Sequence, residues 1–138
     1  MAKQSFSAQV KAFTDRAKKK QEVIFRTSAA RVMDEAGVPK AQGGRMPVDT
    51  GNLRNSTVAS AGGGAADPAL VFATMKVGET VTAGWNTAYA MRMEFGFHGP
   101  DSLGRVYAQE GNAFLRTSAQ RWQEYVHEAA EHAEATVK

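Results

Sequence analysis

Two histidines near the C-terminal end have the residue types of a zinc-binding helix. The stretch reads His127-Glu128-Ala129-Ala130-Glu131-His132. Histidines that share a metal on one helix stand four residues apart, whereas these are five apart, about 140° around the helix axis. The reversed zinc motif also fails by one residue. We therefore interpret both histidines as exposed, titrating side chains on a glutamate-rich helix face, and we predict no metal site.

Glu94 is the remaining candidate for acid–base chemistry. It has no second carboxylate close to it in the sequence, so its expected role is to accept hydrogen bonds from backbone amides or to pair with an arginine such as Arg54. The chain has no cysteine, which removes thiol nucleophiles, disulfides and thiolate metal ligands. A small hydrolase centred on Glu94 or a histidine stays open, because a triad assembled in three dimensions leaves no local motif. We predict no catalytic residue and no cofactor.

Two other stretches could bind phosphate or nucleic acid. Gly62-Gly63-Gly64 has the composition of a phosphate cradle, but no Lys-Ser/Thr pair follows it, so a linker is the better interpretation. Lys18-Lys19-Lys20 covers about 200° of a helix, so its lysines do not all face one partner. The aromatic residues are not interleaved with basic ones as a stacking platform requires. A basic nucleic-acid-binding module that uses this lysine-rich helix is the alternative function.

The richest local pattern is a turn in residues 46–56. Pro47 sets its own φ, Asp49 can accept bonds from the amides ahead of it, and Gly51 supplies a positive φ without steric cost. Leu53 then gives the turn an apolar side chain for the core, while Arg54 carries its charge away from the core. The sequence predicts a fixed corner here.

Three blocks together resemble the tail-completion (head–tail joining) family of tailed bacteriophages. They are Pro47-Val48-Asp49-Thr50-Gly51-x-Leu53-Arg54-x-Ser56, Tyr89-Ala90-x-x-x-Glu94-Phe95-Gly96 and Phe114-Leu115-Arg116. Their order and spacing match that family from Pro47 to Ala119.

The resemblance implies a non-enzymatic virion protein of the phage neck or tail end, assembled in the host cytoplasm. Its copies would form a ring, sixfold or twelvefold, that completes the tail and joins it to the head. The implied partners are sister copies, tail-tube or terminator proteins and head connector or adaptor proteins. Genomic DNA in the channel would lie nearby, and no membrane is involved.

Composition and charge fit one globular domain over residues 1–138. Hydrophobic residues make up 43% and charged residues 22% of the chain. No apolar run approaches membrane-spanning length, and no secretory signal pattern is present. Residues 1–54 hold 11 Lys and Arg against 5 Asp and Glu, while residues 105–138 hold 4 against 5. We expect the basic section of one copy to attract the acidic section of a neighbouring copy.

The hydrophobic pattern predicts an α+β fold, with two long terminal helices packed on a small antiparallel sheet and with two long loops. Residues 1–36 contain the N-terminal helix, which Ser5 or Ser7 can cap and which Gly37 and Pro39 end. Residues 37–55 are predicted as loop and turn. We expect residues 37–46 to be mobile in the free protein, because they offer few apolar anchors.

Strands, a short helical turn and a second long helix are predicted beyond the corner. Residues 56–86 hold antiparallel strands at 56–61, 70–77 and 80–85, with Gly78-Glu79 as a hairpin turn between the last two. In residues 87–111, Tyr89, Met91, Met93 and Phe95 alternate as in a strand, yet Gly96 is well placed to end a short helix. The resemblance favours the helical turn, and a loop is predicted after it. Residues 112–138 form the C-terminal helix, capped by Asn112. Its predicted inward stripe is Leu115, Ala119, Trp122, Val126, Ala129 or Ala130, Ala133 and Val137, and its outward face carries Glu124, Glu128, Glu131 and Glu134.

Overall fold

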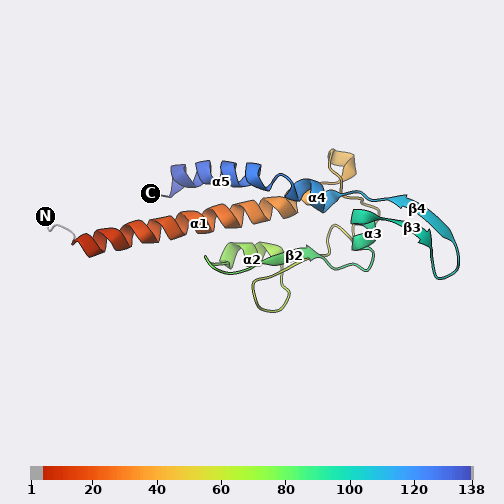
Figure 1. Ribbon diagram of the computed structural model, residues 1–138, viewed down its shortest axis with the longest axis horizontal. Coiled ribbons are helices and arrows are strands. Elements are labelled where there is room, and N and C mark those ends of the chain that lie inside the picture. Colours follow the sequence, from red (N-terminus) through yellow and green to blue (C-terminus); the bar gives the residue numbers. More distant parts are fainter. Residues whose placement is uncertain (1–4, 138) are drawn as a thin grey trace.

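A long N-terminal helix, α1 (Phe6–Ala36), extends along most of the molecule (Figure 1). The computed structural model describes residues 5–137. Ser5 caps α1, because its hydroxyl accepts a hydrogen bond from the Ala8 amide at 3.2 Å, and Gly37 ends the helix with its amide bonded to Met33 O at 3.0 Å. The predicted helix is confirmed, and so is the α+β class. The strands, however, form two separate two-stranded antiparallel sheets in place of one sheet.

The C-terminal helix is divided into two, α4 (Phe114–Ala119) and α5 (Trp122–Thr136), where one continuous helix was predicted. Ser118 is buried and donates its hydroxyl hydrogen bond to Val32 O of α1 at 2.7 Å, which holds α4 against α1 before the chain turns. The buried residues of this segment are Phe114, Ser118, Tyr125, Ala129, Ala133 and Val137. The predicted stripe is therefore wrong at Ala119, which is exposed, and it missed the buried Tyr125. Leu115, Trp122 and Val126 are half-buried, and Trp122 packs on Phe25 of α1.

The helices α1 and α5 lie side by side (Figure 1) and are joined by ion pairs. Lys20 of α1 contacts Glu134 of α5 at 2.9 Å, and Arg31 pairs with Glu128. These two pairs join the basic first section to the acidic last section within one chain, whereas the sequence predicted attraction between neighbouring copies. The reason is geometric, because antiparallel packing brings the basic first helix beside the acidic last one. Glu128 and Glu134 are therefore not on a purely outward face.

The segment between the corner and α3 contains β1 (Thr57–Ser60), α2 (Pro68–Thr74) and β2 (Thr82–Trp85). The predicted strand 70–77 is wrong, since most of it is α2. Asp67 caps this helix by accepting the Ala69 amide hydrogen bond at 3.3 Å, and Pro68 occupies its first turn. The residues at 78–79 turn the chain from α2 into β2, and β2 pairs with β1 in the register Thr57↔Trp85, so no hairpin forms there.

Residues 96–111 were predicted as a loop, and they form a hairpin of β3 (Gly96–Pro100) and β4 (Val106–Glu110). Asp101 organises the hairpin tip. Its Oδ1 accepts hydrogen bonds from the amides of Leu103 and Arg105, both at 2.9 Å, and its Oδ2 pairs with Arg105 Nε at 2.6 Å. The hairpin follows α3 (Ala90–Phe95), which confirms the predicted helical turn and its end at Gly96.

The loop at residues 37–46 is held to the core, which corrects the expectation of too few apolar anchors. It contains a single 3-10 turn, η1 (Lys40–Gln42), and Met46 is 0% exposed. The Met46 amide bonds to Val38 O, and Met46 O accepts from the Lys40 amide, both at 3.1 Å. Met46 packs with Ala36, Leu53 and Phe114 in one cluster, so the loop closes on itself.

Candidate functional site

The three sequence blocks meet at one junction, although they are far apart along the chain. Leu53 from the first block and Phe114 from the third are both buried in the cluster that includes Met46. Ala90 of the second block and Leu115 of the third pack against this cluster. Figure 1 shows α3 and α4 close together at the base of the hairpin, where this junction lies.

Glu94 holds the second block to the third. Its side chain is buried, with Oε2 accepting from the Leu115 amide at 2.9 Å and Oε1 accepting from the Arg116 amide at 3.0 Å and Arg116 Nε at 3.1 Å. The carboxylate thus satisfies amides of the first turn of α4, which have no partner within that helix. The expected bonds to backbone amides are confirmed. Pairing with an arginine is also confirmed, but the arginine is Arg116. Arg54, the example named, instead donates to Gly37 O at 2.9 Å.

Backbone hydrogen bonds reinforce the same connection. The amide of Asn112 donates to Met93 O at 2.8 Å, and that of Ala113 donates to Glu94 O at 3.1 Å. The side chain of Asn112 also donates to Met93 O at 2.8 Å. The predicted cap at Asn112 is therefore wrong, because the residue binds α3. Ala113 occupies the cap position of α4, with a φ of 51°.

Two glycines allow this close approach of backbones. A Cβ on Gly96 would lie 2.5 Å from Gln109 O, and a Cβ on Gly111 would collide with Glu94 O and lie 2.6 Å from Phe95 C. Gly96 also has a φ of 83°, as expected for a residue that ends a helix. The role of Gly111 was missed by sequence reasoning. Its only signal is its residue type, because the atoms that crowd it come from the end of α3 and the start of β3, far away in the sequence.

The corner at residues 47–54 has the expected turn geometry. Gly51 has a φ of 85°, and its carbonyl accepts the Asn55 amide at 3.0 Å. Leu53 is 4% exposed, which confirms its predicted place in the core. Asp49 differs from the prediction. It is exposed and accepts no hydrogen bond from the residues that the structure describes, and the side chain that accepts an amide here is Thr50, from Asn52 at 3.4 Å.

The corner and α3 share a shallow surface pocket of about 420 Å³. Val48 and Tyr89, which both line it, are 49% and 41% exposed. The first two blocks thus form a surface with apolar side chains as well as a buried junction. Lining residues from the two blocks are Pro47, Val48, Asp49, Thr50, Gly51, Leu53 and Tyr89.

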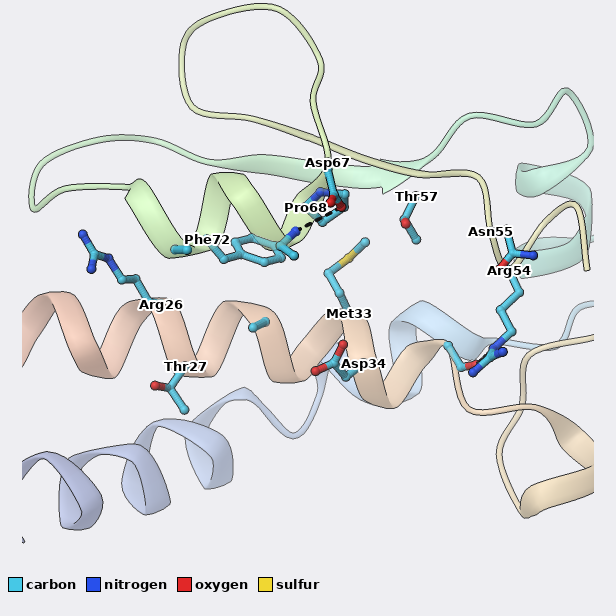
Figure 2. A pocket seen from close by; sticks show the side chains of 14 residues that line it. Arg26, Thr27, Met33, Asp34, Arg54, Asn55, Thr57, Asp67, Pro68 and Phe72 are labelled. Atoms are coloured by element: carbon cyan, nitrogen blue, oxygen red, sulfur yellow. Dashed lines mark hydrogen bonds between the residues drawn. The ribbon is translucent and has the colours of Figure 1, made fainter.

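A larger pocket of about 690 Å³ lies between α1 and α2 (Figure 2). Its polar side chains hold the fold together. Arg26 donates to Met75 O at 2.8 Å, Arg54 donates to Gly37 O, and Asp67 caps α2. Figure 2 shows Arg26 and Arg54 at opposite ends of the pocket. Because these groups are engaged and separated, the pocket does not gather a reactive set of side chains.

The residues with metal-site chemistry are placed on the surface of α5. His127 Nε2 lies 3.2 Å from Glu131 Oε1, one helical turn further along α5. Within residues 5–137, no three His, Cys, Asp or Glu side chains are grouped so that they could hold a metal ion. No helix in this described part has the length and apolar character needed to cross a membrane.

Comparison of the chain with protein families, with curated proteins and with solved structures finds no match.

Proposed function

We propose that the protein is a structural, non-enzymatic part of the neck or tail end of a tailed bacteriophage, where its copies form a ring that completes the tail and joins it to the head. The observation that carries this proposal is the convergence of the three family-like blocks on one junction. Leu53, Glu94 and Phe114 are all buried there, one from each block. Blocks that jointly build one rigid junction are consistent with a shared structural role.

The exposed surface supports assembly with other chains. The molecule exposes 9454 Å², whereas a compact protein of 14.8 kDa exposes about 7,000 Å². The excess is about 2,500 Å² per chain, which is more than the roughly 800 Å² per partner that a standard interface buries. Many large apolar side chains contribute to it, namely Phe6, Val10, Phe13, Phe25, Val48, Leu70, Val77, Tyr89, Met91, Phe95, Leu103, Val106 and Tyr107. Covering such side chains is the driving force that a ring would use.

The environment of Glu94 favours a structural role over a hydrolytic one. Both carboxylate oxygens accept hydrogen bonds from Leu115 and Arg116, and the side chain is 6% exposed. A general base must reach the proton that it abstracts. A carboxylate that is buried and engaged in this way instead fixes the direction in which α4 leaves the junction.

The test of the proposed function is to locate this chain in purified phage particles by immunogold electron microscopy, and to measure the mass of the purified protein in solution. We expect label at the head–tail junction and a mass that is a multiple of the 14.8 kDa chain. A protein that stays monomeric at every concentration and is absent from particles would overturn the proposal.

Gly51→Val is expected to abolish tail joining while leaving α1 and α5 formed. Gly51 has a φ of 85°, and a β-branched residue held at this φ would destabilise the corner by about 1–2 kcal/mol or more. We therefore expect the corner to rearrange. Infectivity of a phage with the substitution measures the first effect, and far-ultraviolet circular dichroism measures the second. Gly63→Val is the matched control, because a Cβ there meets nothing within 4 Å. Wild-type infectivity of the Gly51 variant would contradict the prediction.

The nucleic-acid-binding alternative rests on exposed basic residues of α1. Arg16, Lys18 and Lys19 are exposed, while Lys11 and Lys20 pair with Asp15 and Glu134. We expect weak DNA binding whose log affinity falls with log salt by a slope of about −2 to −3, since each phosphate contact contributes about −0.9. Filter binding or fluorescence anisotropy across salt concentrations measures the slope. A much steeper slope, lost in Lys18→Glu, would favour the alternative.

A further inference from the structure

We propose that the β3–β4 hairpin of one copy docks into an apolar groove between α1, α5 and the segment that follows α2 (residues 75–79) on a second copy of this chain. The inference rests on the proposed ring and names the two surfaces that would build its repeating contact.

The hairpin is a projecting element with little support from its own chain. Figure 1 shows it extending beyond α3, away from α1 and α5. At its far end Leu103 is 76% exposed and Val106 is 80% exposed. A two-stranded hairpin standing alone in water is marginally stable, so burial of these side chains against a partner would stabilise it.

The tip can enter an apolar site without bringing an unpaired charge with it. Its two ionised residues, Asp101 and Arg105, contact each other at 2.6 Å. Desolvation acts to raise the pKa of Asp101, but the hydrogen bonds from Arg105 and Leu103 outweigh it, and the pKa lies below its usual value. The pair therefore stays ionised and mutually neutralised at neutral pH, which limits the cost of burying it.

The groove is a recess of about 430 Å³ on another part of the molecule. Phe25 and Trp122 meet edge to face in it, with ring centroids 6.0 Å apart. The same two rings line a neighbouring pocket of about 310 Å³, so the apolar surface continues beyond the groove. The main apolar residues that line the groove are Ile24, Phe25, Met75, Val77, Trp122 and Val126.

The geometry points to a second copy as the occupant. The hairpin lies at one end of the molecule, whereas the groove residues belong to α1, α5 and the segment that follows α2, so a chain cannot fill its own groove (Figure 1). A projection and a recess at different places make a head-to-tail contact, which closes into a ring when the rotation between successive copies brings the last copy back to the first. A standard interface buries about 800 Å² on each partner, and a copy in a ring takes part in two interfaces, so it buries about 1,600 Å². The excess exposed surface of about 2,500 Å² per copy is larger than this area.

Disulfide trapping tests the contact, because the chain has no cysteine of its own. Leu103→Cys places a thiol on the hairpin, and Val77→Cys places one at the groove, where Val77 is 47% exposed. Mixing the two variants under mild oxidation is expected to give covalent dimers at least about tenfold above the control mixture, since a disulfide forms only where Cα atoms come within about 7 Å. The control is Leu103→Cys mixed with Leu70→Cys. Leu70 is 60% exposed on α2 and lies outside the groove.

The double variant with Leu103→Cys and Val77→Cys is expected to give a ladder of covalent oligomers. Equal trapping with Leu70→Cys, or dimers from Leu103→Cys alone, would overturn the inference, the second result showing hairpin-to-hairpin contact. The mass of the oxidant-free protein separates this inference from the proposed ring. A ring without the Leu103–Val77 link removes only the inference, whereas a permanent monomer removes both. Both substituted side chains are exposed, and circular dichroism checks that the fold is unchanged.

Discussion

Glu94→Ala is expected to lower the free energy of unfolding by about 2–4 kcal/mol, a large part of the 5–15 kcal/mol typical of a domain. The substitution leaves the amides of Leu115 and Arg116 without an acceptor in a partly buried place and removes the partner of the Arg116 side chain. Because the Arg116 side chain is 52% exposed, water can solvate its guanidinium, which keeps the loss below that of a fully buried ion pair. Urea denaturation followed by circular dichroism measures the change.

Two other variants give this result its controls. Glu94→Gln keeps one oxygen as an acceptor and is expected to lose about half as much as Glu94→Ala. Arg116→Ala keeps the carboxylate on the two amides and is expected to lose about 1 kcal/mol or less, as for an exposed ion pair. The order of stability therefore separates an anchoring carboxylate from a catalytic one. Wild-type stability of Glu94→Gln, together with loss of a hydrolytic activity, would refute the anchoring role.

Gly111→Ala is expected to destabilise the protein by about 3 kcal/mol and to loosen the base of the hairpin. Its new Cβ would collide with Glu94 O and lie 2.6 Å from Phe95 C, and both are backbone atoms that cannot rotate away. The backbone bonds from Asn112 and Ala113 to α3 would have to lengthen. Thermal unfolding measures the stability loss, and solution mass shows whether assembly is lost with it.

The matched control for Gly111→Ala is Gly64→Ala. A Cβ on Gly64 meets nothing within 4 Å, so we expect a change of about 0–1 kcal/mol, and in the stabilising direction, because alanine reduces the freedom of the unfolded chain. Equal behaviour of the two alanine variants would mean that the tight contact between β4 and α3 does not exist in solution.

Local chemistry determined several features from the sequence alone. Ser5 marks the start of α1 and Gly37 marks its end, because both residues act through hydrogen bonds to atoms a few residues away. The Gly51 turn follows for the same reason, since positive φ is a property of one residue. Gly96 likewise ends α3. In each of these cases the decisive interaction lies within about one helical turn of the residue.

The misassigned segments were those with two acceptable local structures. Val71, Met75 and Val77 alternate as in a strand, yet Val71, Phe72 and Met75 also share one face of a helix. Packing of Phe72 and Met75 on Met33 of α1, with the cap at Asp67, favours the helix. The hairpin at residues 96–110 depends on pairing between two strands, whose register no single strand specifies.

The junction divides in the same way between sequence and tertiary structure. Residue types alone identified Glu94 as a hydrogen-bond acceptor, because a carboxylate without a partner carboxylate needs hydrogen-bond donors. They also identified Leu53 as a core residue, because burial of an apolar side chain is favourable. The placement of α4 beside α3 decided that Arg116, and not Arg54, contacts Glu94. The path of the chain after β4 decided that Gly111 lies close to Glu94 O. Partners distant in the chain are chosen by how the elements pack, and that choice is made only when the whole chain has folded.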